Sequence, residues 1–166
     1  YILGVTGNEL GGSEYYEHLG YVGLHVPQIK PEPFKKLYQA LAQAIDNELI
    51  ASAHGIYRGG LGVHLAMVAM GGNLGMQIDL AKVPVENIDR SDMILFSESA
   101  GRFIVTIDPK NRDSFEKILK GHTCACVGTV TEKNQFIING TDDKILIDLS
   151  VQDLKDAWEK PFGGLI

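Results

Sequence analysis

The chain has 166 residues, which is enough for one domain with a proper hydrophobic core. Hydrophobic residues make up 45% and charged residues 22%, as in average globular proteins, so the composition argues against a disordered chain. The net charge is −6, the longest run of Lys and Arg is the pair at 35–36, and no apolar run approaches ~18 residues, which disfavours a nucleic-acid partner and a membrane span.

The first expected element is the apolar run 1–5, which is typical of a buried strand. The chain opens there at Tyr1 without a methionine, so we expect residues 1–166 to be a single domain cut from a longer protein. A brief helix is expected over 13–20, with Gly20 at its end.

Two longer helices dominate the middle of the chain. Over 31–49 a proline is followed by apolar residues at steps of three and four, which predicts an amphipathic helix that buries Phe34, Leu37, Tyr38, Leu41, Ile45 and Leu49. A helix rich in small residues is expected over 60–71, closed by two glycines. The other expected helices are 109–120 and 150–160, and the other expected strands are 50–56, 75–80, 103–107, 124–130, 135–140 and 144–149. Because helices and strands interleave, we expect an α/β or α+β fold with a mixed β-sheet covered by helices.

The two cysteines, Cys124 and Cys126, lie two positions apart in an expected strand. Their side chains would share one face of that strand, where a disulfide between them would be strained. We interpret them as small core residues with free thiols, which suits a reducing cytoplasm.

The stretch "ELGGSEYY" (9–16) places two glycines and a serine before a helix start. The first turn of a helix has unpaired N–H groups, and glycines let the backbone approach an anion closely. Gly11, Gly12 and Ser13 are therefore candidates for a phosphate site. The alternative is an N-cap by Ser13, with the glycines forming the turn. The stretch matches neither the Walker pattern nor the dinucleotide fingerprint.

The stretch "AHGIYRGGLG" (53–62) carries a strand end followed by a glycine turn that starts a helix. Arg58 offers a fixed positive charge beside that helix start, so Arg58, Gly59 and Gly60 are candidates for binding a nucleotide or substrate. His54 has two interpretations, a catalytic histidine or a hydrogen-bonded structural one. His64 lies inside the expected helix and is interpreted as structural.

The stretch "LFSESAGRF" (95–103) crowds polar side chains into a short turn between apolar runs. Glu98 is flanked by the hydroxyls of Ser97 and Ser99, and Mg²⁺ takes carboxylate and hydroxyl oxygens, so Glu98 is a candidate metal ligand. Arg102 is expected to pair with Glu98 or with a ligand phosphate. The alternative is a solvated turn with an internal ion pair.

Together these stretches resemble the C-terminal domain of phosphoribosylformylglycinamidine synthase, the synthetase subunit of purine biosynthesis. "LGGSEYY" is similar to that family's LGGS stretch, and "LFSESAGRFIVTI" is similar to its LFxES…R strand. "AHGIYRGGLGVHLAMVAMGGNLGMQIDL" is similar to its HDxSDGGL segment with the helix and strand that follow. The wider superfamily includes aminoimidazole ribonucleotide synthetase, thiamine-monophosphate kinase, selenophosphate synthetase and a hydrogenase maturation protein. A sister activity is therefore an alternative.

The resemblance implies a ligase that uses ATP, Mg²⁺ and ammonia from glutamine to convert the formyl amide of a ribotide into an amidine. ATP phosphorylates the amide oxygen, ammonia adds to the carbon, and phosphate leaves. By resemblance, Gly11, Gly12 and Ser13 bind the ribose phosphate, and the turn 97–99 lies beside ATP, metal and substrate. The implied partners are the protein's own N-terminal domain, a glutaminase subunit and a small accessory subunit. Because the family's ATP and metal ligands lie largely in the N-terminal domain, we expect the isolated chain to be catalytically silent.

One departure from the family pattern lies at 54–60, where HDxSDGG is replaced by His-Gly-Ile-Tyr-Arg-Gly-Gly. The two acids give way to Gly55 and Arg58, so a carboxylate that would contact nucleotide or metal has no counterpart here. Either this charge comes from elsewhere, or the domain is a degenerate module that binds a nucleotide or a partner subunit without catalysis.

Overall fold

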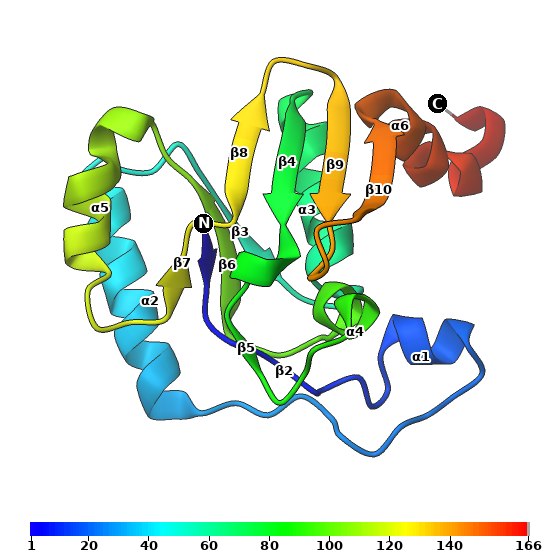
Figure 1. The fold of residues 1–166 in the computed structure, drawn as a ribbon, viewed down its shortest axis with the longest axis horizontal. Coiled ribbons are helices and arrows are strands. Elements are labelled where there is room, and N and C mark those ends of the chain that lie inside the picture. The colour runs from blue at the N-terminus through cyan, green and yellow to red at the C-terminus, as the bar shows by residue number, and fades with distance from the viewer. Residues whose placement is uncertain (166) are drawn as a thin grey trace.

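The computed structural model describes residues 1–165, in which helices and strands interleave (Figure 1). The helices are α1 (Glu14–His18), α2 (Pro31–Asp46), α3 (Gly60–Gly72), α4 (Ser91–Phe96), α5 (Arg112–Ile118) and α6 (Val151–Glu159), with 3-10 turns η1 (Leu80–Lys82), η2 (Pro109–Asn111) and η3 (Lys160–Leu165). The strands are β1 (Ile2–Leu3), β2 (Thr6–Gly7), β3 (Ser52–Ile56), β4 (Gly75–Asp79), β5 (Val85–Glu86), β6 (Arg102–Thr106), β7 (Cys124–Ala125), β8 (Gly128–Thr131), β9 (Gln135–Asn139) and β10 (Ile145–Ser150). The structure confirms the α+β class and the two expected long helices. The first of these ends earlier than expected, before Glu48, which adopts a positive φ of 56°.

The strands of residues 1–165 form two four-stranded sheets and a short parallel pair, rather than one mixed sheet. The first sheet has the order β3-β6-β1-β7 with antiparallel neighbours, and the pair is β2-β5. The second has the order β10-β9-β4-β8 and is mixed, because β4 and β9 run parallel. The expected strand 124–130 is divided between the sheets, since β7 pairs with β1 and β8 pairs with β4. The break between β7 and β8 is where the chain crosses from one sheet to the other.

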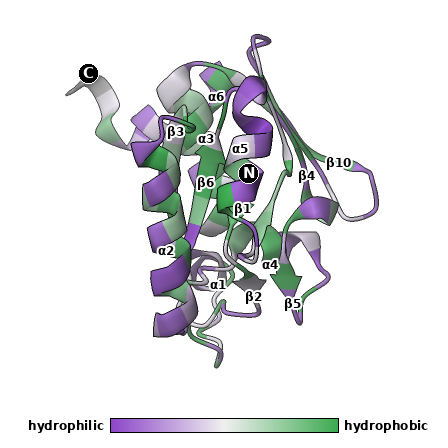
Figure 2. Ribbon diagram, turned by 90° about the vertical axis from the view of Figure 1, so that its left-hand side faces the viewer, coloured by the Kyte–Doolittle hydropathy of each residue, from purple (hydrophilic) through white to green (hydrophobic). Residues whose placement is uncertain are grey.

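The first sheet buries both of its faces, as the alternation of side chains along a strand requires. Ile2 and Ile104 belong to a hydrophobic cluster shared with α3, α4 and the second sheet. Their neighbours Leu3 and Val105 belong to a second cluster with α2 and α5. Figure 2 shows hydrophobic colouring along β6 and alternating hydrophilic and hydrophobic bands along α2. The first sheet is therefore the central layer of the domain.

Helix α2 buries a different stripe from the one expected. Its buried residues are Leu37, Ala40, Leu41 and Ala44, whereas Tyr38 and Ile45 are 55% and 50% exposed. Two of the inward positions are thus taken by alanines, Ala40 and Ala44, which the expected stripe did not include. Of the expected positions in this helix, Leu37 and Leu41 are confirmed as core residues.

Both cysteines are free and half-buried. Cys124 packs against the cluster beneath α2 and α5, and burial raises the pKa of its thiol to about 11. Cys124 lies on β7 and Cys126 lies in the break between β7 and β8, so the two do not share one long strand. None of the helices found in residues 1–165 is long and apolar enough to cross a membrane.

Candidate functional site

The three glycine- and serine-rich stretches meet at one junction. The Gly7 N–H donates to Ser99 Oγ at 2.9 Å, and Ser97 Oγ donates to the Gly7 carbonyl at 2.7 Å. The Glu98 carboxylate accepts hydrogen bonds from the N–H of Glu14, the first residue of α1, and from the N–H of Gly59 in the turn before α3. The structure therefore brings together segments that lie up to about ninety positions apart in the chain.

The turn 11–13 is held by internal hydrogen bonds. The N–H groups of Gly11 and Gly12 donate to the carbonyl oxygens of His25 and Val22, both at 2.7 Å. Ser13 is the N-cap of α1, with Oγ accepting from the N–H of Tyr16 at 3.2 Å. The N-cap that the sequence allowed is thus formed, and phosphate binding by Gly11–Ser13 stays a prediction.

The two glycines of this turn are required for different reasons. A Cβ on Gly11 would lie 2.8 Å from the backbone of His25, so close approach of the chain excludes a side chain there. Gly12 has a φ of +72°, and a Cβ on it would meet nothing within 4 Å. Gly12 therefore faces open space, into which a ligand could come without displacing protein atoms.

Arg58 points away from its own turn toward α1. It forms ion pairs with Glu14 and with Glu17, the second at 3.8 Å, while its side chain stays 75% exposed. Exposed ion pairs contribute little to stability. The positive charge that replaces the family's acid is therefore accompanied by two carboxylates from another element.

His54 lies on β3 and contacts His64 on α3. The distance from His54 Nε2 to His64 Nδ1 is 2.9 Å, and His64 Nε2 is 3.1 Å from the carbonyl oxygen of Arg58. His64 is buried, in keeping with the structural interpretation. His54 is hydrogen-bonded, and its catalytic role stays a prediction.

The polar side chains of the turn 97–102 are buried, which the sequence did not indicate. Arg102, Ser97 and Ser99 are 1%, 0% and 2% exposed. The Arg102 guanidinium donates to Thr6 Oγ1 at 2.8 Å, to the Ser97 carbonyl at 2.6 Å and to the Ser99 carbonyl at 2.8 Å. Burial lowers the pKa of Arg102 to about 10, so this side chain stays charged at neutral pH. The expected ion pair between Arg102 and Glu98 is wrong for the described residues, because these carbonyls and the threonine hydroxyl already take the guanidinium donors.

Glu98 has backbone partners in place of the expected hydroxyls. Its Oε1 accepts from the Glu14 N–H at 3.0 Å and from the Gly59 N–H at 2.8 Å, whereas both serine hydroxyls face Gly7. Residues 1–165 contain no group of three or more His, Cys, Asp or Glu side chains that could hold a metal ion. The donor set of this turn does not fit a metal site built from the protein alone.

Replacing Glu98 by alanine should destabilise the domain by about 1–3 kcal/mol, because two backbone N–H groups lose their acceptor. Glu98→Gln keeps an acceptor oxygen in the same place and should cost less than half as much. Chemical denaturation of both variants measures the difference. Equal losses for the two variants would show that the charge, and not the acceptor oxygen, holds the turns together.

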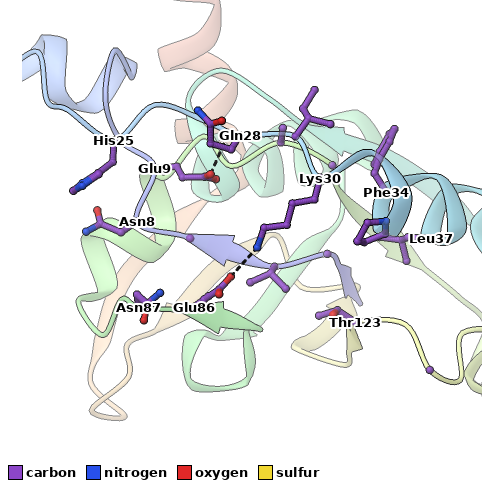
Figure 3. A pocket seen from close by; sticks show the side chains of 18 residues that line it. Asn8, Glu9, His25, Gln28, Lys30, Phe34, Leu37, Glu86, Asn87 and Thr123 are labelled. Carbon is purple, nitrogen blue, oxygen red and sulfur yellow. Dashed lines mark hydrogen bonds and ion pairs between the residues drawn. The ribbon is translucent and has the colours of Figure 1, made fainter.

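A cavity of about 620 Å³ opens beside this junction, between the segment 25–34 and the β2–β5 pair (Figure 3). Its polar wall includes an ion pair of Lys30 with Glu86 at 3.5 Å and a hydrogen bond from the Gln28 N–H to Glu9 at 2.9 Å. Its apolar wall includes Phe34, whose ring stacks on Phe103. This volume is in the range of small-molecule sites. Sequence reasoning missed the cavity because the segment before α2 shows no helical or strand period.

The sequence matches the family described as "AIR synthase related protein, C-terminal domain" over residues 1–140. The phosphoribosylformylglycinamidine synthase subunit PurL of Methanococcus aeolicus is 35% identical over 99% of this chain. The same subunit of Caldanaerobacter subterraneus subsp. tengcongensis is 37% identical over 95%. The chain spans 22% and 21% of the length of these two relatives.

Solved structures show the same fold. Thermotoga maritima PurL complexed with FGAR has a TM-score of 0.77 at 24% identity, over 92% of this chain and 27% of that one. A HypE–HypF complex has a TM-score of 0.62 at 19% identity, over 90% of this chain and 51% of that one. The resemblance to phosphoribosylformylglycinamidine synthase is confirmed. The match over residues 1–140 shows that the chain belongs to the AIR synthase related protein family and is similar to its C-terminal domain.

Proposed function

We propose that the chain is the C-terminal domain of a phosphoribosylformylglycinamidine synthase, a ligase that converts formylglycinamide ribotide into its amidine with ATP and ammonia from glutamine. The observation that carries this proposal is the similarity to PurL subunits over nearly the whole chain, at 32–37% identity. The meeting of all three stretches at one junction supports it, because these are the stretches that resemble the family's motifs.

The partners in this proposal come from the relatives. Thermotoga maritima structures carry the names PurL complexed with FGAR and PurL complexed with ATP, and another is named PurLQS. We propose that the chain works with its own N-terminal domain, a glutaminase subunit and a small accessory subunit, in the cytoplasm. Mg²⁺ enters as the ion carried by ATP, because this ion is typically held by one or two carboxylates together with substrate phosphates.

The proposed roles of the residues follow the family resemblance. Gly11, Gly12 and Ser13 form the turn that would bind the ribose phosphate, and of the three Gly12 is the exposed one. Gly59, Gly60 and Arg58 form the second wall toward nucleotide or substrate, and His54 exchanges a proton. The turn of Ser97, Glu98, Ser99 and Arg102 holds both walls in position beside ATP.

A second candidate function is a degenerate module that binds a nucleotide or a partner subunit without catalysis. It is favoured by the glycine and arginine at 55 and 58, where the family has acids, and by the ion pairs that occupy Arg58. The deciding experiment measures ADP release by the full polypeptide containing residues 1–166, with ATP, Mg²⁺, ammonia and formylglycinamide ribotide. Ribotide-dependent ADP release supports the ligase, and ribotide binding without turnover supports the module.

Replacing Gly12 with valine in that polypeptide should weaken ribotide binding by at least about tenfold, which corresponds to about 1.4 kcal/mol of binding free energy. The affinity for ATP should stay nearly unchanged. The side chain would fill the open space beside the proposed phosphate position. Gly20→Val is the matched control, since Gly20 has a φ of +79° and also meets nothing within 4 Å, but lies beyond α1. Calorimetry with each ligand gives the affinities. Unchanged ribotide affinity in Gly12→Val, or equal losses of ribotide affinity in the two variants, would show that the glycines only form the turn and do not bind the phosphate.

A further inference from the structure

The pair formed by His54 and His64 is a feature that the family pattern at 54–60 does not include. His54 is half-buried on β3 and His64 is 6% exposed on α3. Their ring centroids are 5.1 Å apart, and the ring of Tyr57 meets that of His64 edge-on at 5.7 Å. The two imidazoles are therefore held by separate elements, and an aromatic ring packs against that of His64.

The positions of the ring protons follow from the partners. A carbonyl oxygen accepts and never donates, so the contact of His64 Nε2 with the Arg58 carbonyl requires a proton on Nε2. A neutral His64 then has a lone pair on Nδ1, and the 2.9 Å contact requires His54 Nε2 to donate. The reverse arrangement would place the unprotonated Nε2 of His64 against the carbonyl, with two acceptors facing each other. The geometry therefore selects one direction for the hydrogen bond.

The surroundings keep His64 neutral. Burial lowers its pKa, and positive charge on His54 and on Arg102 acts in the same direction. The Arg58 carbonyl and the Glu98 carboxylate act in the opposite direction, and the net change is downward. His54 Nε2 then carries a proton, and His54 Nδ1, with which none of residues 1–165 forms a hydrogen bond, is the nitrogen of the pair left without a protein partner.

We propose that His64 is a positioning residue that fixes the ring of His54, with Nε2–H donating to His64 and Nδ1 left as the proton-accepting nitrogen of the pair. The proposal deepens the proposed function by naming the atom through which His54 would exchange a proton, and to that extent rests on it. The hydrogen-bond direction is a property of the chain itself and can be measured on residues 1–166 without any substrate.

Long-range ¹H–¹⁵N spectra of the histidine-labelled chain test the proton positions directly. At pH 7.5 we expect Nε2 protonated in both rings, Nδ1 of His64 unprotonated, and a His54 Nε2–H signal protected from exchange with water. A proton on His64 Nδ1 at pH 7.5, or a His54 Nε2 without its proton, would overturn the proposal.

Two variants separate this role from simple packing. In His64→Asn the amide oxygen takes the place of Nδ1 and can still accept from His54, whereas His64→Gln places its amide near Nε2 and can contact only the Arg58 carbonyl. The protected His54 Nε2–H signal should persist in His64→Asn and disappear in His64→Gln. Equal behaviour in both variants would contradict the proposal. Should neither variant fold, the spectra of the unmodified chain still decide it.

These results stand apart from the ligase assay. If the pair has the expected proton positions and the full polypeptide shows no ribotide-dependent ADP release, the proposed function fails and the positioning role remains. If the polypeptide is an active ligase and the proton positions are reversed, the positioning role fails alone.

Discussion

Replacing Arg102 with alanine should destabilise the domain by at least about 3 kcal/mol, because three buried hydrogen bonds from a charged donor are lost and each contributes about 1.5–3 kcal/mol. The guanidinium holds the carbonyls of Ser97 and Ser99 and the hydroxyl of Thr6 in a place that water does not reach. Buried acceptors without a donor carry their full desolvation cost. Urea denaturation followed by circular dichroism gives the free energy of unfolding.

Arg112→Ala is the control for this prediction. Arg112 forms an ion pair with Glu116, but its side chain is 59% exposed, and such pairs contribute about 0–1 kcal/mol. The contrast between the two arginines tests whether burial sets the cost. If Arg102→Ala were as mild as Arg112→Ala, the turn 97–101 would have another means of support.

Gly60→Ala should cost about 1–3 kcal/mol more than Gly12→Ala, although the two glycines have nearly the same φ, +73° and +72°. Both substitutions place a Cβ on a residue with left-handed backbone geometry, which costs about 1–2 kcal/mol. Only at Gly60 would the new Cβ lie 2.7 Å from backbone atoms, namely those of Leu95, Phe96 and Ser97. Backbone packed between α4 and the following turn cannot move aside as a side chain can.

The difference in denaturation midpoint between these two variants gives the cost of close packing by itself, since the strain cancels. Similar midpoints would mean that the turn 97–101 shifts to make room. In that case the backbone of the junction can shift more easily than its contacts indicate, and the turn before α3 can move relative to Glu98.

Local patterns predicted most of the elements, because periodicity reports which face of a segment is buried. Helix α3 and its glycine turn, the N-cap at Ser13 and the strands β3, β4, β9 and β10 were all visible in this way. The stripe of α2 was partly wrong because the search for large apolar side chains passed over Ala40 and Ala44, which are buried, and included Tyr38 and Ile45, which are exposed.

The site was less predictable because its contacts join distant parts of the chain. The sequence of a polar turn with Ser97, Ser99 and Arg102 is equally compatible with a solvated loop and with a buried hydrogen-bonded turn. What decides between them is Thr6, which lies 96 positions earlier and receives the guanidinium. Likewise, the cavity is lined by residues near 8, 28 and 86, which lie far apart in the sequence, so no local motif predicts it.

The pairing of β1 has a consequence for the order in which the domain folds during synthesis. Ile2 and Leu3 pair with Phe103 and Ile104 on one side and with Cys124 and Ala125 on the other. At about 5–20 residues per second, the ribosome needs roughly 5–20 s to make the hundred residues between β1 and its first partner strand. Until then, this apolar segment has no strand to pair with, while α2 and α3 are already complete. Closure of the first sheet is therefore a late event with a long loop to close, and folding should be slow compared with helical domains of similar size.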